Sequence, residues 1–207
     1  MKHCCDKEED IAALRGAHLK VLQIVLAINL VMFLVEMTAG WLSQSTSLLA
    51  DSLDMLGDSL VYGFSLYVLN RSITWQARAS LLKGGIMLLF GFAVIVEAIF
   101  KVMNPIVPGA DIMTLIGVLA LTMNSICFAL LWRHRDDNIN LQSTWICSRN
   151  DLIANCGVLL AALLTAVLSS RWPDLIIGLL IATVFLQSAV SVLRQATEAI
   201  SADQCSE

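Results

Sequence analysis

The stretch Ser45–Tyr62, STSLLADSLDMLGDSLVY, combines a hydrophobic segment with three carboxylates, Asp51, Asp54 and Asp58. Their spacing of i, i+3 and i+7 places them on one stripe of an α-helix, and leucines cover the rest of its surface. On a helix of a soluble protein, such a stripe is usually a solvated face. The meaning of the three carboxylates therefore depends on whether this segment lies in water or in a membrane.

The composition of the whole chain answers that question. The 207 residues are 57% hydrophobic and 14% charged, and the mean hydropathy is +0.76. These values are far from those of soluble domains and predict an all-α integral membrane protein. A span needs about 20 residues, so we expect six transmembrane helices. They are Val21–Trp41, Ser47–Leu69, Leu81–Met103, Ile112–Trp132, Trp145–Leu168 and Leu175–Leu193.

This pattern leaves no room for a second domain. We expect a cytoplasmic tail and helix lead at residues 1–20, a six-span transport domain at residues 21–194 and a short cytoplasmic tail at residues 195–207. The N-terminus is too acidic, and the first span too long, for a cleaved secretory signal. The first span should therefore remain in the membrane, for which we expect the inner (plasma) membrane of a bacterium.

The basic residues predict the orientation. Of the 13 Lys and Arg, only Lys101 and Arg171 fall on one side of a six-span arrangement, and the others belong to the opposite side or to span ends next to it. By the positive-inside rule, both termini are cytoplasmic. The sequence has no basic patch that could bind nucleic acid.

A cation site is the simplest reason for carboxylates inside a span, because each costs several kcal/mol in hydrocarbon unless it is protonated, paired or bound to a cation. Asp54 and Asp58 lie 7 and 11 positions into their span, and no Lys or Arg is expected deep in any span. The second and fifth spans run in opposite directions, so Asp54 should be level with Asp151, and Asp58 with Cys147. Each pair is one turn, ~6 Å, apart, which lets the four side chains converge on one ion.

The ligand chemistry then suggests a mechanism. Three carboxylates and a thiolate suit tetrahedral Zn²⁺, and sulfur favours Zn²⁺ and Cd²⁺ over Mg²⁺, Ca²⁺ or Mn²⁺. Such ligands must lose protons to bind a dication, so metal and protons compete for the same atoms. We therefore expect a transporter that exchanges metal for protons, not an enzyme. It needs no cofactor, and no nucleotide-binding loop indicates ATP as the driver.

Other polar residues of the spans have less specific interpretations. Asp51 lies nearer the outer mouth and is interpreted as an exit-path or helix-contact carboxylate. Asn155 follows Asp151 by one turn, on the same helical face. Glu36, near the outer end of the first span, is expected to extend to the interface.

The N-terminal tail holds further potential metal ligands. His3, Cys4 and Cys5 could gather a soft metal ion before transport. Short termini rich in such groups also occur without any role, and the sequence leaves both interpretations open.

These motifs resemble those of the cation diffusion facilitators, which are six-span exporters of divalent transition metals. STSLLADSLDMLGD looks like the second-span signature, with Asp54 and Asp58 at its [H/D]xxxD ligands. CSRNDLIANCGVLLAA looks like the fifth-span signature, with Asp151 at its acid and Cys147 where His or Asp usually stands. EAIFKVMNP is similar to the end of the family's third span, and WPDLIIGLLIA to the start of its sixth.

The resemblance implies zinc-type export, proton exchange and a homodimer. Zn²⁺ or Cd²⁺ is the expected substrate, and Co²⁺, Ni²⁺ and Fe²⁺ are alternatives, because Cys147 departs from the usual ligand. The family's cytoplasmic domain after the sixth span has no counterpart among these residues, so we expect a short form. Its dimerisation would then rest on the membrane spans.

Two other classes of protein also place acids inside a membrane. A proton-coupled exporter of small organic cations shares the buried carboxylates but gains nothing from Cys147. An intramembrane aspartyl protease would need Gly in place of Met55 for its GxGD motif, and no tyrosine precedes Asp151. The metal exporter therefore accounts for more of the residues than either alternative.

Overall fold

In this computed structural model, the described backbone covers residues 3–68, 73–132 and 139–204 and forms α-helices without any strand. Within the helices, the side chains of residues 3–19, 61–62, 64–68, 73–80, 83, 139–147, 195 and 199–204 lie outside the described part. The helices confirm the all-α prediction. They are α1 (His3–Ser43), α2 (Thr46–Val68), α3 (Ile73–Met103), α4 (Ala110–Trp132), α5 (Ile139–Leu168) and α6 (Trp172–Gln204).

Local sequence explains several helix ends. Pro105 and Pro108 follow α3, where a proline cannot continue the hydrogen-bonded turn. Pro173 lies in the first turn of α6, where its fixed φ suits a helix start. The predicted spans end at the same residues as α3, α4 and α5. By contrast, α1 and α6 extend well beyond their predicted spans, because the helical conformation continues through residues 3–20 and 194–204.

The joint between α1 and α2 consists of only two residues. Gln44 has a φ of 56°, the left-handed conformation that commonly ends a helix. Its N–H donates to the Trp41 carbonyl at 3.2 Å, and the Ser45 N–H donates to the Gly40 carbonyl at 2.9 Å. This pair of hydrogen bonds is a Schellman motif, and it reverses the chain within one turn of α1.

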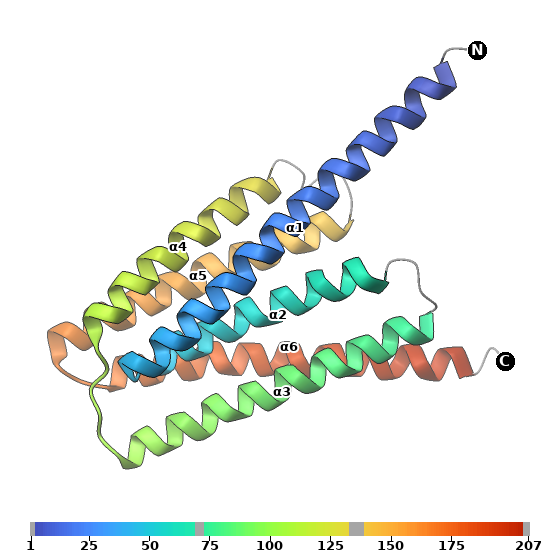
Figure 1. Ribbon diagram of the computed structural model, residues 1–207. Helices are drawn as coiled ribbons and strands as arrows, with labels where there is room; N and C mark the ends of the chain where they lie inside the picture. The colour runs from blue at the N-terminus through green and yellow to red at the C-terminus, as the bar shows by residue number, and fades with distance from the viewer. Residues whose placement is uncertain (1–2, 69–72, 133–138, 205–207) are drawn as a thin grey trace.

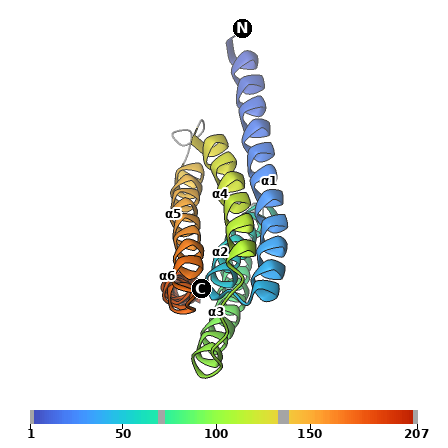
Figure 2. The same ribbon diagram turned by 90° about the vertical axis from the view of Figure 1, so that its left-hand side faces the viewer.

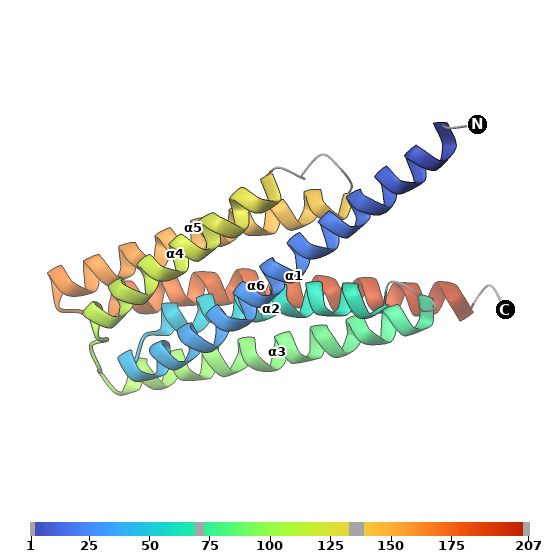
Figure 3. The same ribbon diagram turned by 45° about the horizontal axis from the view of Figure 1, so that its top comes forward.

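The helices pack as three antiparallel pairs, α1 with α2, α3 with α6, and α4 with α5. Figure 3 shows α2, α3 and α6 side by side, with α4 and α5 as a second group. Helix α4 lies between α1 and α5 in Figure 2. The joints 44–45, 104–109 and 169–171 lie at one end of the bundle, here called the turn end, and the first residues of α1 and the last of α6 lie at the other, the termini end (Figure 1).

Five of these helices are long and apolar enough to cross a membrane, and they are α1, α3, α4, α5 and α6. Helix α2 has a comparable length but carries three carboxylates, so composition alone does not qualify it. Large apolar side chains cover the outside of the bundle; Leu115 and Val167 are 71% and 72% exposed. Such a surface suits contact with lipid.

Candidate metal-transport site

Carboxylates from two helices line one cavity that is partly open to the outside of the bundle. Asp54 and Asp58 of α2 and Asp151 of α5 border a space of about 530 Å³, whose remaining walls come largely from apolar residues of α3, α5 and α6. Helices α5 and α6 meet at the turn end and diverge toward the termini end (Figures 1 and 3). The cavity lies among α2, α3, α5 and α6, so a cation entering it would meet acids within mostly hydrophobic walls.

A glycine lets α6 approach α2 beside these acids. Gly57 lies between Asp54 and Asp58 in the sequence, and a Cβ on it would lie 3.2 Å from Cε2 of Phe185. That distance is tighter than ordinary van der Waals contact, so an alanine would push against the aromatic ring. Gly57 therefore helps to set the spacing between the helix that carries the two carboxylates and the opposite wall.

The structure brings together three of the four predicted ligands, but it does not gather them around one point. Asp54 and Asp58 are half-buried and Asp151 is 8% exposed. Among the described side chains, no three His, Cys, Asp or Glu lie close enough to hold one ion. The side chain of Cys147 lies outside the described residues, as do those of His3, Cys4 and Cys5. Four-ligand coordination therefore stays a prediction.

Asn155 lies one turn after Asp151 on α5 and is not among the residues that line the cavity. It is fully buried, and its Nδ2 donates to the backbone carbonyl of Asp151 at 2.8 Å. Its Oδ1 is buried and accepts no hydrogen bond from the described residues. The predicted common face of these two residues on α5 is present, and Asn155 offers a free acceptor beside the site.

Two further acids are buried away from the cavity walls. Asp51 is fully buried in contact with α1, which favours the helix-contact alternative for this residue. Glu36 is also fully buried, so the prediction that it extends to the interface is wrong. The physical reason is packing, because α1 lies against α2 and α4 along this face and the two acids meet between α1 and α2.

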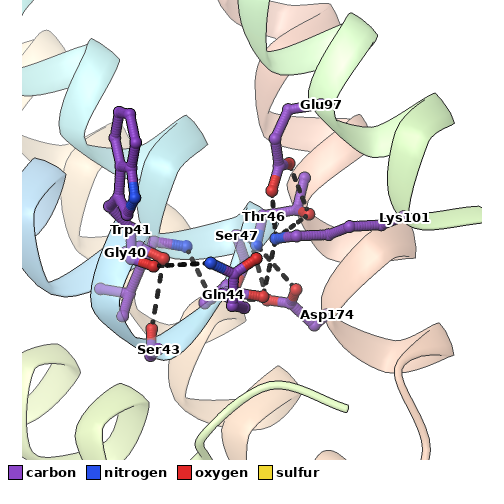
Figure 4. Close-up of polar contacts among 11 residues, drawn as sticks. Gly40, Trp41, Ser43, Gln44, Thr46, Ser47, Glu97, Lys101 and Asp174 are labelled. Atoms are coloured by element: carbon purple, nitrogen blue, oxygen red, sulfur yellow. Dashed lines mark hydrogen bonds and ion pairs between the residues drawn. The ribbon is translucent and has the colours of Figure 1, made fainter. Parts of the chain in front are cut away.

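A polar network at the turn end anchors the start of α2 (Figure 4). Asp174 of α6 accepts the backbone N–H of Thr46 at 2.7 Å on Oδ2, and that of Ser47 at 3.0 Å on Oδ1. Its Oδ1 also accepts the hydroxyls of Ser45 and Ser47, at 2.7 and 2.6 Å. The Ser45 hydroxyl accepts the next N–H, that of Leu48, at 3.2 Å. The first three N–H groups of α2 are thus all satisfied, two of them by another helix.

A buried lysine holds the other side of the same joint. Lys101 of α3 is only 2% exposed and forms an ion pair with Glu97 one turn earlier. Its Nζ donates to the Gln44 carbonyl at 2.7 Å and to Oγ1 of Thr46 at 3.1 Å. A cation thus lies at the C-terminal end of α1 and an anion at the N-terminal end of α2, the arrangement that helix dipoles favour. We call these residues the turn-end network; they are Gln44, Ser45, Thr46, Ser47, Glu97, Lys101 and Asp174.

Comparison with known proteins identifies the family to which this helical bundle belongs. Residues 22–201 match the model of the cation efflux transmembrane domain. The chain belongs to the cation efflux family. The match covers all the described helices except the first part of α1 and the last residues of α6.

Several curated proteins are similar to this cation efflux chain. The zinc transporter ZitB of Yersinia pestis is 27% identical over 85% of this chain and 61% of its own length. The cadmium, cobalt and zinc/H(+)-K(+) antiporter of Bacillus subtilis is 25% identical over 86% of this chain and 62% of its own. The metal cation efflux system protein CzcD of Cupriavidus metallidurans is 23% identical over the same shares. The chain thus spans about three fifths of the length of these relatives.

Sequence reasoning on this cation efflux protein missed the turn-end network. The sequence placed Lys101 on the outer side of the membrane and assigned no role to Asp174. In fact Lys101 is buried, so a cation does lie inside the bundle, although it is bound at the turn end and not beside Asp54. The one local signal was the run of three hydroxyl residues 45–47, which are typical helix caps.

Proposed function

We propose that this cation efflux protein exports divalent transition-metal ions, Zn²⁺ or Cd²⁺ first among them, in exchange for protons. The observation that carries the proposal is the cavity bordered by Asp54, Asp58 and Asp151 from two different helices. Buried carboxylates in a membrane protein need a cation or a proton. The relatives described above, a zinc transporter and a cadmium, cobalt and zinc/H(+)-K(+) antiporter, support the same class of substrate.

The ion would be bound by Asp54, Asp58, Cys147 and Asp151. In the arrangement described here the acids line the cavity without converging, so these side chains would have to move toward one point to bind an ion. Metal and protons then compete for the same ligand atoms, because a carboxylate or thiolate binds Zn²⁺ only after losing its proton. The metal would leave on the outer side, the emptied ligands would take up protons from that same side, and these protons would be released on the inner side when metal binds again, which completes an antiport cycle.

The direction of transport depends on orientation. We infer that α2 crosses the membrane together with the five helices named above, and that the termini end faces the cytoplasm, which the distribution of Lys and Arg supports. The turn-end network would then close the outer side while α5 and α6 diverge on the cytoplasmic side. A fluorescent protein fused after Glu207 should fluoresce, because it folds in the bacterial cytoplasm. A fusion without fluorescence, whose fluorescent protein reached the periplasm and did not fold there, would contradict this orientation.

The proposal includes a homodimer formed through the membrane spans, an expectation that comes from the resemblance to the family. Single-molecule photobleaching in liposomes would count the copies. A single bleaching step for most particles, at high labelling efficiency, would contradict a dimer.

Zinc-driven proton flux in proteoliposomes tests the function. An imposed Zn²⁺ gradient should change the pH inside liposomes that contain the wild-type chain, and Asp54→Ala should abolish this signal. The matched control is Asp111→Ala, since Asp111 is exposed in the first turn of α4. Absence of flux from the wild type would refute metal–proton exchange, and flux driven by ethidium instead of Zn²⁺ would favour an exporter of organic cations.

Substitution of the proposed sulfur ligand tests the site itself. Cys147→Ser should reduce Cd²⁺ transport more than Zn²⁺ transport, because the softer ion depends more on sulfur. Unchanged flux of both ions would remove Cys147 from the ligand set.

A further inference from the structure

Glu36 of α1 and Asp51 of α2 form a buried pair of acids outside the cavity lining. Both side chains are 0% exposed. All four of their carboxyl oxygens are buried, and none accepts a hydrogen bond from a described donor. Helices α1 and α2 touch closely here, because a Cβ on Gly40 would lie 3.0 Å from Leu49. Glu36 lies one turn before Gly40 and Asp51 two residues after Leu49, so the two carboxyl groups interact across this contact. Fully buried oxygens of this kind are almost always satisfied in folded proteins, so something must occupy the contact.

The surroundings of the pair favour a proton as the occupant. Two adjacent ionised carboxylates repel each other and lose their hydration when buried. The negative charges of Asp54 and Asp151 also act on Glu36 and make a doubly ionised pair still less favourable. One shared proton removes a charge and lets one carboxyl donate to the other.

Other charged groups on the neighbouring helices are engaged elsewhere. On α3, Lys101 binds Glu97 and two acceptors of the α1–α2 joint, and on α6 Asp174 binds the first N–H groups of α2. On α4, the buried thiol of Cys127 packs with Val25. Val25 is 11 residues before Glu36 on α1, or about 16 Å along the helix axis.

A metal ion fits this contact less well than a proton. The described side chains offer no group of three metal-binding residues here, so a dication would have only two carboxylates. Divalent transition metals usually take at least three protein ligands.

We propose that Glu36 and Asp51 bind one proton in common, at a site separate from the proposed metal ligands. The O–H of one carboxyl donates to an oxygen of the other, so the pair carries one negative charge. This inference deepens the proposed function and, in its coupling to metal, rests on it. A dication arriving next to Asp54, one turn along α2 from Asp51, stabilises the doubly ionised pair, and the proton then leaves for water.

Infrared spectroscopy of the metal-free protein in liposomes tests the proton directly. Protonated carboxyl groups absorb at a different infrared frequency from carboxylates. The double variant Glu36→Gln with Asp51→Asn should therefore lose the absorption of one protonated carboxyl group at neutral pH. The exchanged variant Glu36→Asp with Asp51→Glu should retain it, and so should Glu198→Gln, whose carboxylate is 67% exposed. A double variant that absorbs like the wild type overturns the proposal.

The single variants give an answer even if the double variant does not fold. In Glu36→Gln the remaining Asp51 carboxyl faces an amide instead of a carboxyl, so its absorption should change in frequency. An unchanged frequency in both Glu36→Gln and Asp51→Asn would show that the two groups share no proton.

Proton release on metal binding tests the coupling. In weakly buffered solution, the wild type should release one more proton per bound Zn²⁺ than the double variant. Equal release from both proteins overturns the coupling. If the wild type binds no Zn²⁺, the proposed function fails, while the infrared result, obtained without metal, still decides whether the pair holds a proton.

Discussion

The carboxylate of Asp174 should be a major stabilising contact of this bundle, and Asp174→Ala tests that expectation. The substitution removes the acceptor of two backbone N–H groups, those of Thr46 and Ser47, in a fully buried position. Each buried N–H left without a partner costs about 1–3 kcal/mol, so the variant should lose about 2–6 kcal/mol of unfolding free energy. The hydroxyls of Ser45 and Ser47 add little, because they lie 3.3 Å apart and can bond each other.

Denaturant titration in detergent micelles, followed by circular dichroism, would measure this loss. Asp111→Ala is the matched control, because Asp111 lies in the first turn of its own helix and is exposed. Its loss should stay within the 0.3–1 kcal/mol of a surface charge near a helix N-terminus. If the two variants were equally stable, Asp174 would not hold α2 in place, and the account of the turn-end network would be wrong.

Three further predictions concern helix contacts. Gly178→Ala should destabilise the protein by about 1–3 kcal/mol, because the new Cβ would lie 2.7 Å from the backbone carbon of Thr46. The control Gly85→Ala should not destabilise it, because a Cβ on Gly85 meets nothing within 4 Å. Equal denaturation midpoints for the two variants would contradict the close contact of α6 with α2. Lys101→Met should cost about 1–3 kcal/mol through the lost charge-assisted hydrogen bonds, as measured by the same titration, and no loss would contradict its role at the joint. Adding Glu97→Gln to Lys101→Met should recover part of that loss, because it removes the unpaired charge, and a further loss would show that Glu97 needs no cation.

Much of the architecture follows from local sequence. Hydrophobic runs of about 20 residues and the prolines after residue 103 predicted helices whose ends agree with α3, α4 and α5. The stripe formed by Asp54 and Asp58 follows from the period of an α-helix alone. That Asp151 shares a cavity with them was predicted from the opposite directions of two spans, and the structure places all three residues on one cavity. Whether Cys147 joins them as a ligand stays a prediction.

The contacts that hold the α1–α2 joint to α3 and α6, which sequence reasoning missed, join residues far apart in the chain. Asp174 and Ser47 are separated by 127 positions and Lys101 and Thr46 by 55, and no local periodicity relates them. The burial of Glu36 could not be predicted from local sequence either. An acid near the end of a span can reach water unless neighbouring helices cover it, and in this bundle they cover Glu36 completely. The sequence by itself determined the helices and the acidic stripe, since both depend on hydrogen bonds and spacing within one segment. Only the packing of α1, α2, α3 and α6 decided which charges are buried together, because burial depends on the surfaces that distant segments present to each other.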